Sequence, residues 1–315
     1  MAGLLCRGRL PGPYSRVVST GTDPLAPLAE LPGVPEAVAE VRKSVDRLYG
    51  HRVMRRRASE VTSEAALRGA RASAALDGAD WPLEEVRRRT DFGADAEART
   101  VGAALRVSAE AGQLLSTWRH SPLQVLARLH LIAAGDADGT AGRPRRAGEG
   151  AEALFPLELK ASVGPAAGSD ASPAPIADLP PAPGAEEVAA RLDQLSTLLV
   201  ARTEGAGAKA PALVVAAVVH GELLALRPFG SHNGVVARAA QRIVLIAEGL
   251  DPKAICPAEV GLAELGTDAY RRSLGGYLAG TPDGMAGWID HCGQALRLGT
   301  RESTAVCEAM QRGMV

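Results

Sequence analysis

One stretch of the chain, residues 211–226, restricts the fold more than any other because it is apolar on nearly every side. Its sequence is PALVVAAVVHGELLAL, and a helix of this composition has no polar face to turn toward water. Sixteen residues are too few to cross a bilayer, which requires about 20. Pro228 ends the helix, because the residue before a proline is pushed out of the helical region. We therefore expect a central helix that other helices surround.

The rest of the chain shows helical periodicity rather than the two-residue alternation of strands. The segments with this periodicity are 35–48, 59–76, 95–117, 121–134, 185–203, 234–249, 266–280, 284–297 and 301–311. Around residues 141–160 we expect at most a short hairpin. The sequence thus predicts an all-α fold, a helical bundle with an N-terminal helical extension.

Composition divides the chain into four parts. Residues 1–34 contain many Pro and Gly without periodicity, and we expect an irregular arm there. Residues 35–118 form an N-terminal helical region, 119–300 a helical core, and 301–315 a C-terminal helix. Within the core, residues 161–184 are rich in Ala, Pro, Gly and Ser and cannot bury enough side chain to order themselves. We interpret them as a flexible loop inside one domain.

Charge and cysteine content exclude several classes of partner. Lys and Arg number 35 against 36 Asp and Glu, so the near-neutral chain attracts neither nucleic acid nor an anionic membrane surface. The N-terminus lacks the apolar run of a secretory signal. The four cysteines are scattered without C-x-x-C spacing, which disfavours a zinc site or a disulfide framework and predicts a cytoplasmic location. We expect Cys256 and Cys292 to be core residues.

Chemistry is indicated at one place, the joint between the central helix and the next one, residues 226–238. A short loop containing Pro and Gly runs into a helix N-terminus there, and the free backbone N–H groups and the dipole of such an end favour an anion. Ser231 or Asn233 is suited to cap the helix, and Arg238, one turn in, could reach a phosphate beside the loop. An ordinary helix–loop–helix turn without a ligand remains the simpler alternative.

This loop resembles the signature loop of the Fic/Doc (Fido) family, H-P-F-x-[D/E]-G-N-G-R-x-x-R, which lies at the same joint between two core helices. The positions that the chain keeps are Pro228, Phe229, Asn233, Gly234 and Arg238. The resemblance implies a Fido-type fold and a nucleotide or anion site on the loop. The candidate binding residues are Ser231, His232, Asn233, Gly234 and Arg238.

Further pieces resemble the same family, in the same order along the chain. Ser73, Asp77 and Gly78 stand at the positions of its inhibitory-helix motif, which implies a contact between Asp77 and Arg238. Gly142 and Arg145 resemble the segment that leads into the flap clamping a target peptide. A histidine on the central helix and later aromatic residues complete the resemblance: His220, Tyr270, Tyr277 and Trp288.

Two of these pieces have a simpler interpretation. Residues 73–78 read equally well as a helix end with Gly78 as its left-handed cap. His220, on an apolar helix, is more often a hydrogen-bonded core histidine than a catalyst. Both interpretations stay open at this point.

Four loop positions depart from the family pattern, and they decide the function that we expect. Arg227 stands in place of the histidine that is the general base, and an arginine stays protonated and cannot take a proton. Ser231 replaces the acidic residue that holds Mg²⁺, so we expect no metal. His232 stands at a glycine position, and Val235 replaces the first arginine. No catalytic residue of the family is intact, and His232 is the one candidate for a displaced base.

The resemblance and its departures together imply a degenerate Fic-family protein, impaired in AMP transfer, that acts as a binding or regulatory module. ATP is expected to bind weakly and with little or no dependence on Mg²⁺, and the role is compatible with a protein partner and with oligomers. The alternative is an active transferase that moves AMP or another phosphate-containing group to protein hydroxyls, with Arg227 binding substrate phosphate. We expect Arg227 and Arg238 to border one pocket. A structural helical protein without a ligand is the third interpretation.

Overall fold

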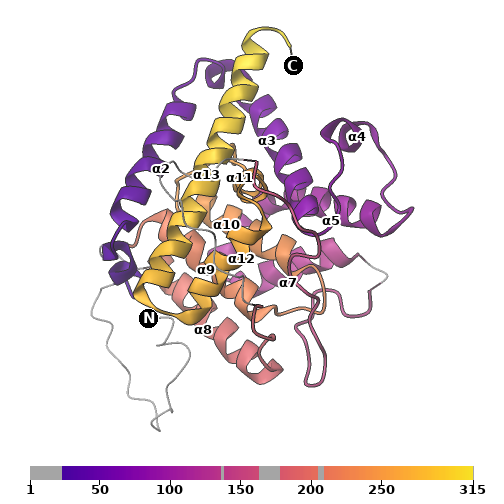
Figure 1. The fold of residues 1–315 in the computed structure, drawn as a ribbon, viewed down its shortest axis with the longest axis vertical. Helices are drawn as coiled ribbons and strands as arrows, with labels where there is room; N and C mark the ends of the chain where they lie inside the picture. Colours follow the sequence, from indigo (N-terminus) through magenta and orange to yellow (C-terminus); the bar gives the residue numbers. More distant parts are fainter. Residues whose placement is uncertain (1–22, 136–137, 163–177, 205–208, 315) are drawn as a thin grey trace.

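The computed structural model describes residues 23–135, 138–162, 178–204 and 209–314. Over these residues the chain folds into helices joined by turns and loops, without a strand, which confirms the all-α prediction (Figure 1). The described residues between 141 and 160 form turns, bends and irregular segments, so no hairpin is observed there. The predicted arm up to residue 22 and most of the predicted loop, residues 163–177, lie outside the described residues.

The elements follow one another along the chain as short 3₁₀ and longer α-helices. They are η1 Ala26–Glu30, α2 Val34–Tyr49, α3 Met54–Leu76, α4 Leu83–Arg88, α5 Ala96–Ala111, η2 Gly112–Leu114, α6 Leu115–Trp118, α7 Pro122–Ala134, α8 Ala185–Glu204, α9 Ala212–Leu226, α10 Asn233–Ala247, α11 Ala258–Leu265, α12 Thr267–Ala279 and α13 Pro282–Gln311.

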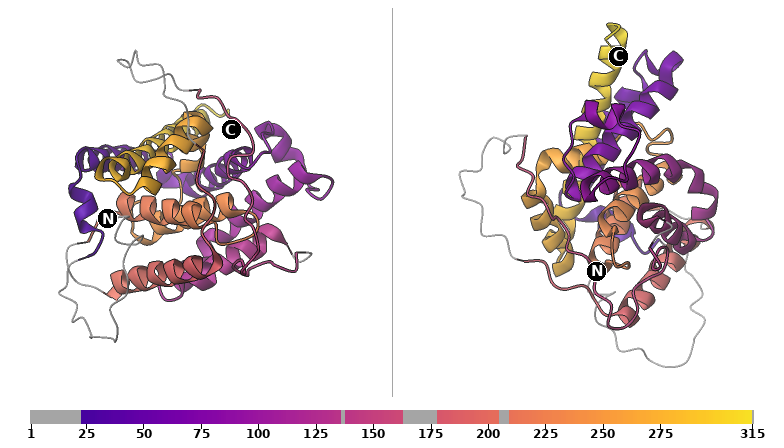
Figure 2. Two further views of the ribbon diagram at one scale, coloured as in Figure 1. Left: turned by 60° about the horizontal axis from the view of Figure 1, so that its bottom comes forward. Right: turned by 90° about the vertical axis from the view of Figure 1, so that its right-hand side faces the viewer.

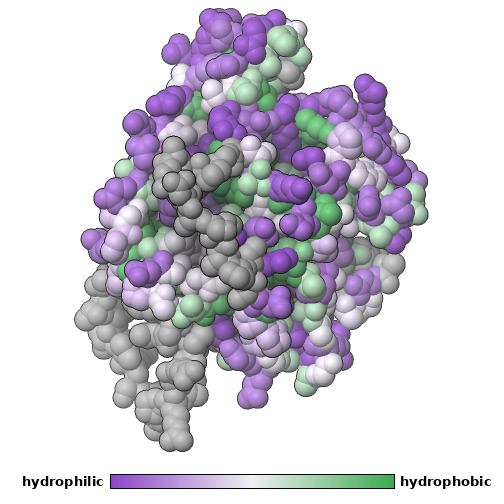
Figure 3. All heavy atoms as spheres, viewed as in Figure 1, coloured by the Kyte–Doolittle hydropathy of each residue, from purple (hydrophilic) through white to green (hydrophobic). Residues whose placement is uncertain are grey.

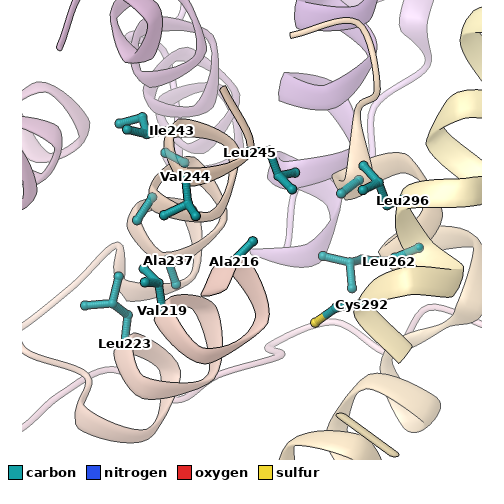
Figure 4. Close-up of a cluster of buried hydrophobic side chains, with 14 of the residues drawn as sticks. Ala216, Val219, Leu223, Ala237, Ile243, Val244, Leu245, Leu262, Cys292 and Leu296 are labelled. Atoms are coloured by element: carbon teal, nitrogen blue, oxygen red, sulfur yellow. The ribbon is translucent and has the colours of Figure 1, made fainter. Parts of the chain in front are cut away.

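The central helix predicted from its apolar sequence is α9, and every residue from Leu213 to Leu226 is buried. It packs against α10 on one side and against α13, α12 and α2 on others. Figure 4 shows Val219 of α9 beside Ala237 of α10. A second group of buried side chains lies where α11 meets α13, and it includes Leu262 and Leu296. Full burial of α9 places its C-terminus in the core, and the following loop runs from buried Phe229 to exposed Gly230 at the surface.

The remaining helices surround this centre. Figure 1 shows α13 running along the molecule between α2 and α3, and Figure 2 shows α8 beside α7 on the other side of α9. Helix α5 packs against α3, α7 and α10. Apolar residues on the face in Figure 3 are interspersed with hydrophilic ones. No helix in the described ranges is both long enough and apolar enough to cross a membrane.

Several helix boundaries differ from the predicted ones. The segments 284–297 and 301–311, predicted as two helices, are the single helix α13. Gly299 lies where they would have been separated, and it lets α13 approach α11, since a Cβ at this position would lie 2.3 Å from the Pro257 carbonyl oxygen. The predicted helix 95–117 is divided into α5, η2 and α6. Helix α3 starts at Met54 rather than near residue 59, with non-helical backbone angles at Arg57.

The close approach of α11 and α13 supports a first prediction about stability. A Cβ at Gly261 would lie 2.0 Å from the Ala295 carbonyl oxygen, so Gly261→Ala must push two helix backbones apart. We expect a loss of about 1–3 kcal/mol or more in the free energy of unfolding, measured with urea. Gly287→Ala is the matched control on α13, because no atom lies within 4 Å of its Cβ position. The free energy of unfolding of that variant should rise by roughly 0.5–1 kcal/mol through helix propensity. Equal effects of the two substitutions would contradict the close packing of α11 against α13.

Candidate functional site

The loop between α9 and α10 begins and ends on residues with a left-handed backbone. Arg227, the C-cap of α9, has φ 44°, and His232, the N-cap of α10, has φ 58°. The prediction that Ser231 or Asn233 caps α10 is wrong, because His232 occupies the cap without a side-chain capping bond and Asn233 is already the first helical residue. The left-handed backbone at Arg227 and at His232 turns the chain where it leaves α9 and where it enters α10.

Asn233 holds the loop closed from inside. Its Oδ1 accepts a hydrogen bond from the Phe229 N–H at 3.0 Å, and its Nδ2 donates to the Phe229 carbonyl oxygen at 2.8 Å. The Phe229 ring is buried and stacks on His130 with ring centroids 4.1 Å apart. Asn233 therefore serves loop geometry, and its amide side chain is not directed at an external ligand.

Residues 145–152, which we call the strap, run along this loop. The Arg145 N–H donates to the Pro228 carbonyl oxygen at 2.8 Å, and the Glu152 N–H donates to the Gly230 carbonyl oxygen at 2.9 Å. The Arg145 guanidinium, itself buried, donates to the carbonyl oxygens of Leu226 and Arg227 at the C-terminus of α9. Arg145 thus neutralises the negative end of the helix dipole.

Gly142, the other residue expected in a flap, precedes the strap. It has φ 73°, and a Cβ there would lie 3.1 Å from the Ala127 carbonyl oxygen. Its N–H donates to His130 Nδ1 at 2.9 Å, so it joins the start of this segment to α7. Gly142 and Arg145 both anchor the chain segment that covers the loop.

The N-terminus of α10 is occupied by a carboxylate of the chain itself. Glu152 Oε1 accepts a hydrogen bond from the Asn233 N–H at 3.0 Å, the position at which an external anion would be bound. Glu152 is exposed as a residue, but its carboxylate lies against the loop. Burial of that group, followed by repulsion from Asp77, raises the pKa of Glu152 to about 7. No motif in the sequence points to Glu152, because only the path of the strap brings it to this helix end.

Arg238, the candidate phosphate ligand, is buried and committed to the end of α3. Its Nε donates to Ser73 Oγ at 2.9 Å, and a terminal nitrogen donates to the Ser73 carbonyl oxygen at 3.0 Å. The same nitrogen lies 2.7 Å from Asp77 Oδ2. The contact between Asp77 and Arg238 implied by the resemblance is therefore present in the structure.

The end of α3 also has the glycine cap of the simpler interpretation. Gly78 has φ 103°, and the bonds Ala79 N–H to Ala74 O (2.9 Å) and Gly78 N–H to Ala75 O (3.1 Å) form a Schellman motif. The two interpretations are compatible, because the cap places Asp77 over α10. Gly234 leaves room for this contact, since a Cβ there would lie 2.4 Å from Asp77 Oδ1 and would displace the carboxylate.

Arg227 points away from this cluster. It donates to the Pro180 carbonyl oxygen at 2.6 Å and lines a cavity of about 380 Å³ together with Arg146 and Gly184, whereas Arg238 does not line that cavity. The prediction that Arg227 and Arg238 border one pocket is wrong, because Arg227 extends to Pro180 whereas Arg238 is buried against Ser73 and Asp77 at the end of α3. Burial, and then the charge of Arg145, lower the pKa of Arg227.

Of the remaining residues selected from the sequence, His232 lies in the loop, whereas Val235 and His220 are buried in the core. His232 Nδ1 lies 2.8 Å from Ser231 Oγ, and burial lowers the pKa of His232. Val235 is only 5% exposed and faces α3 and α5 rather than the loop. His220 is fully buried, with Nε2 2.6 Å from the Tyr270 hydroxyl oxygen, which agrees with a core histidine.

Both cysteines expected in the core are buried. Burial raises the pKa of the Cys256 and Cys292 thiols, so they are protonated at neutral pH. Neither one contributes a nucleophile to the loop.

The chain is similar to known proteins in its structure but not detectably in its sequence. No sequence-family model matches the chain, and no curated protein matches it. A Fic family protein from Desulfovibrio desulfuricans G20 has a similar structure, with a TM-score of 0.63 over 87% of this chain and 75% of that one. The chain has the Fic fold.

The sequence identities are low. The D. desulfuricans protein is 20% identical, and a fragment of Fic-1 from C. elegans is 14% identical, with a TM-score of 0.57 over 88% of this chain and 73% of that fragment. A variant of the same C. elegans fragment has a TM-score of 0.53 at 16% identity. The all-α Fido-type fold implied by the loop resemblance is thereby confirmed, whereas the chemistry of the loop must be judged from this chain's own residues.

The metal that the Fic loop would hold does not fit the residues present. Ser231, at the position of the acidic ligand, offers a neutral hydroxyl that is hydrogen bonded to His232. The nearby carboxylates, Glu152 and Asp77, are engaged by the Asn233 amide and by Arg238. Over the described residues, no three His, Cys, Asp or Glu side chains are grouped to hold a metal ion. Both carboxylates beside the loop already have partners within the chain, so neither is a free ligand for Mg²⁺ in this arrangement.

Proposed function

We propose that this chain is a degenerate member of the Fic fold class, impaired in AMP transfer, that acts as a binding or regulatory module with weak nucleotide affinity. The observation that carries the proposal is the state of the α10 N-terminus. Its first helical amide is bound by Glu152, and Arg238, one turn further, is bound by Asp77 and Ser73. A phosphate must displace the chain's own carboxylates to bind there.

The residue at the base position supports the same conclusion. A general base must accept a proton from the attacking hydroxyl, and Arg227 remains a cation even with the lowered pKa. The loss of a general base alone typically lowers a rate by about 10²–10⁴. His232 has a neutral ring, but it is hydrogen bonded to Ser231 at the other end of the loop. The alternative, an active transferase in which Arg227 binds substrate phosphate beside Arg238, is disfavoured because the two arginines face different sides.

This proposal predicts weak ATP binding that is nearly independent of Mg²⁺. Calorimetric titration of the full chain with ATP and ADP, with and without Mg²⁺, is expected to give dissociation constants well above the micromolar range that change little on chelation. The physical reason is that Ser231 supplies no carboxylate ligand for the ion.

Labelling with an ATP analogue is the second half of this experiment. The folded parent chain should attach no AMP to itself. Micromolar binding that disappears on chelation, or labelling of the parent chain, would show that other residues have kept the metal function and the transferase activity.

A further inference from the structure

The cavity that Arg227 enters lies between the strap and residues 181–185, and its volume is about 380 Å³. This volume is within the range of small-molecule sites, about 300–1,000 Å³. Arg145 and Arg146 line it together with Arg227, and the uncharged lining residues include Gly148, Gly150 and Gly184. Helix α10, all of which the structure describes, contributes no lining residue. The cavity is therefore separate from the α10 N-terminus.

The three arginines of this cavity carry charge that no carboxylate neutralises. Arg145 is 7% exposed, and its guanidinium donates to the carbonyl oxygens of α9, the strap and residue 183, which are neutral groups. Arg227 donates to another carbonyl oxygen, that of Pro180, and its Nε has no hydrogen-bond partner. The Arg146 side chain has neither a hydrogen bond nor an ion pair with any residue that the structure describes.

Glu149 is the one carboxylate among the lining residues, and a cation outside the cavity already neutralises it. The two terminal nitrogens of Arg143 donate to its oxygens at 3.0 and 2.9 Å, and the Arg146 N–H donates at 2.7 Å. Arg143 is not a lining residue, so the charges of Arg145, Arg146 and Arg227 stay uncompensated. After burial, the charge of Arg145 is the second cause that lowers the pKa of Arg227, so these two cations repel each other.

We propose that this cavity binds a phosphate monoester, with Arg146 and Arg227 donating hydrogen bonds to its oxygens and Arg145 adding positive charge to the wall. The proposal goes beyond the proposed function, because site and ligand both differ from those at the α10 N-terminus. A guanidinium group donates two parallel N–H bonds to phosphate oxygens. A phosphate monoester carries nearly two negative charges above its second pKa of about 6, so it matches the excess of positive charge better than a carboxylate does.

The hydrogen bonds of Arg145 hold the two walls of the cavity together before any ligand binds. Its guanidinium donates to the Glu149 carbonyl oxygen in the strap and to the Pro183 carbonyl oxygen in the opposite wall, both at 3.0 Å. It also donates to the Arg227 carbonyl oxygen at 2.8 Å. The backbones that carry Arg146 and Arg227 are thereby joined, and a preorganised site binds its ligand with a smaller cost in conformational entropy.

Inorganic phosphate is the probe, added at constant ionic strength to the full chain with isotope-labelled glycines. The titration is followed by NMR at about pH 8, well above the second pKa of a phosphate monoester. The amide signals of Gly148, Gly150 and Gly184 are expected to shift along one saturable curve, whereas that of Gly234 at the α10 N-terminus stays in place. A shift of Gly234 alone, or no saturable shift, overturns the site.

Two substitutions remove one cation each from the cavity. Arg146→Ala and Arg227→Gln should each weaken phosphate binding at least about tenfold, because a hydrogen bond to a charged group contributes strongly. Arg146 is exposed, so its loss leaves the core intact, and a glutamine at position 227 retains a donor for the Pro180 carbonyl oxygen. Arg88→Ala is the matched control, since it removes the same charge from an exposed position on α4. Equal weakening in all three variants would reveal general electrostatic attraction and overturn the site.

Two further ligands test the chemical class. Acetate at the same ionic strength should bind more weakly than phosphate, and equal affinity would overturn the assignment to a phosphate group. A neutral peptide with one phosphoserine separates two sources of the group. Tighter binding of the peptide than of inorganic phosphate supports a phosphorylated protein, and the reverse supports a free phosphate compound.

ATP titrated into the same proteins tests the proposed function separately. Binding at the α10 N-terminus is read from Gly234, and Arg146→Ala should leave it unchanged. Loss of nucleotide binding and loss of the phosphate site are therefore distinct results, because they are read from different glycines.

Discussion

A chain with five substitutions is expected to attach AMP to itself in the presence of Mg²⁺, whereas the folded parent chain is not. The substitutions are Arg227→His, Ser231→Asp, His232→Gly, Asp77→Gly and Glu152→Ala. The first three supply the base, the metal ligand and the glycine that the Fic/Doc resemblance calls for. The last two remove the carboxylates that face the α10 N-terminus. The readout is transfer of label from an ATP analogue to the protein, which requires no knowledge of a target.

The backbone of the loop is suited to these changes. His232 has φ 58°, a conformation that glycine adopts without strain, so His232→Gly should also relieve the loop. Val235 is left unchanged, because an arginine placed in the small gap between α3, α5 and α10 would disrupt their packing. These residues act as a unit, so single substitutions should have little effect.

The matched control is the four-site variant that retains Arg227. It should bind ATP like the five-site variant and label at least about 100-fold more slowly, because it lacks only the general base. If the five-site variant folds but binds ATP no better than the parent chain, the loop does not have the geometry of an active Fic loop, and the interpretation as a structural helical protein is favoured.

Arg238→Ala is expected to lower the free energy of unfolding by about 3–5 kcal/mol, the usual effect of breaking a buried ion pair. Arg238 is 2% exposed, and it holds the end of α3 against α10 through Ser73 and Asp77. Without it, the Ser73 carbonyl and hydroxyl groups lose their donor in a buried place. Urea unfolding followed by circular dichroism gives the measurement.

The control is another arginine–carboxylate pair on the surface. Arg301 is paired with Glu264, but its side chain is 60% exposed, so Arg301→Ala should cost no more than about 1 kcal/mol. Similar small losses in both variants would mean that Arg238 is solvated in solution. In that case residues 73–78 would be only a helix end with its glycine cap.

Local sequence patterns predicted much of the fold. The predicted helix boundaries were wrong where contacts between distant helices outweigh local propensity. The apolar segment 211–226 could only be a buried helix, and it is α9. The prediction of two helices, 284–297 and 301–311, was wrong, because α13 continues through Gly299. A glycine weakens a helix by local propensity, but at this position it permits the close contact with Pro257 that makes the helix fit. Contacts between helices outweigh local helix propensity. A short stretch of sequence does not show these contacts, because the partner residues lie far away along the chain.

For the candidate site, the sequence by itself determined which chemical groups exist on the loop. Arg227 cannot accept a proton, Ser231 cannot supply a carboxylate, and the Pro228–Asn233 pattern closes a turn before a helix, because these properties belong to the side chains themselves. Only the tertiary structure decided where those groups lie. In the folded chain, Arg227 donates to the Pro180 carbonyl oxygen, Arg238 pairs with Asp77, and Glu152 accepts a hydrogen bond at the N-terminus of α10. Residue 152 precedes its hydrogen-bond partner by 81 positions, and the path of the chain over such a separation is set by packing around the core.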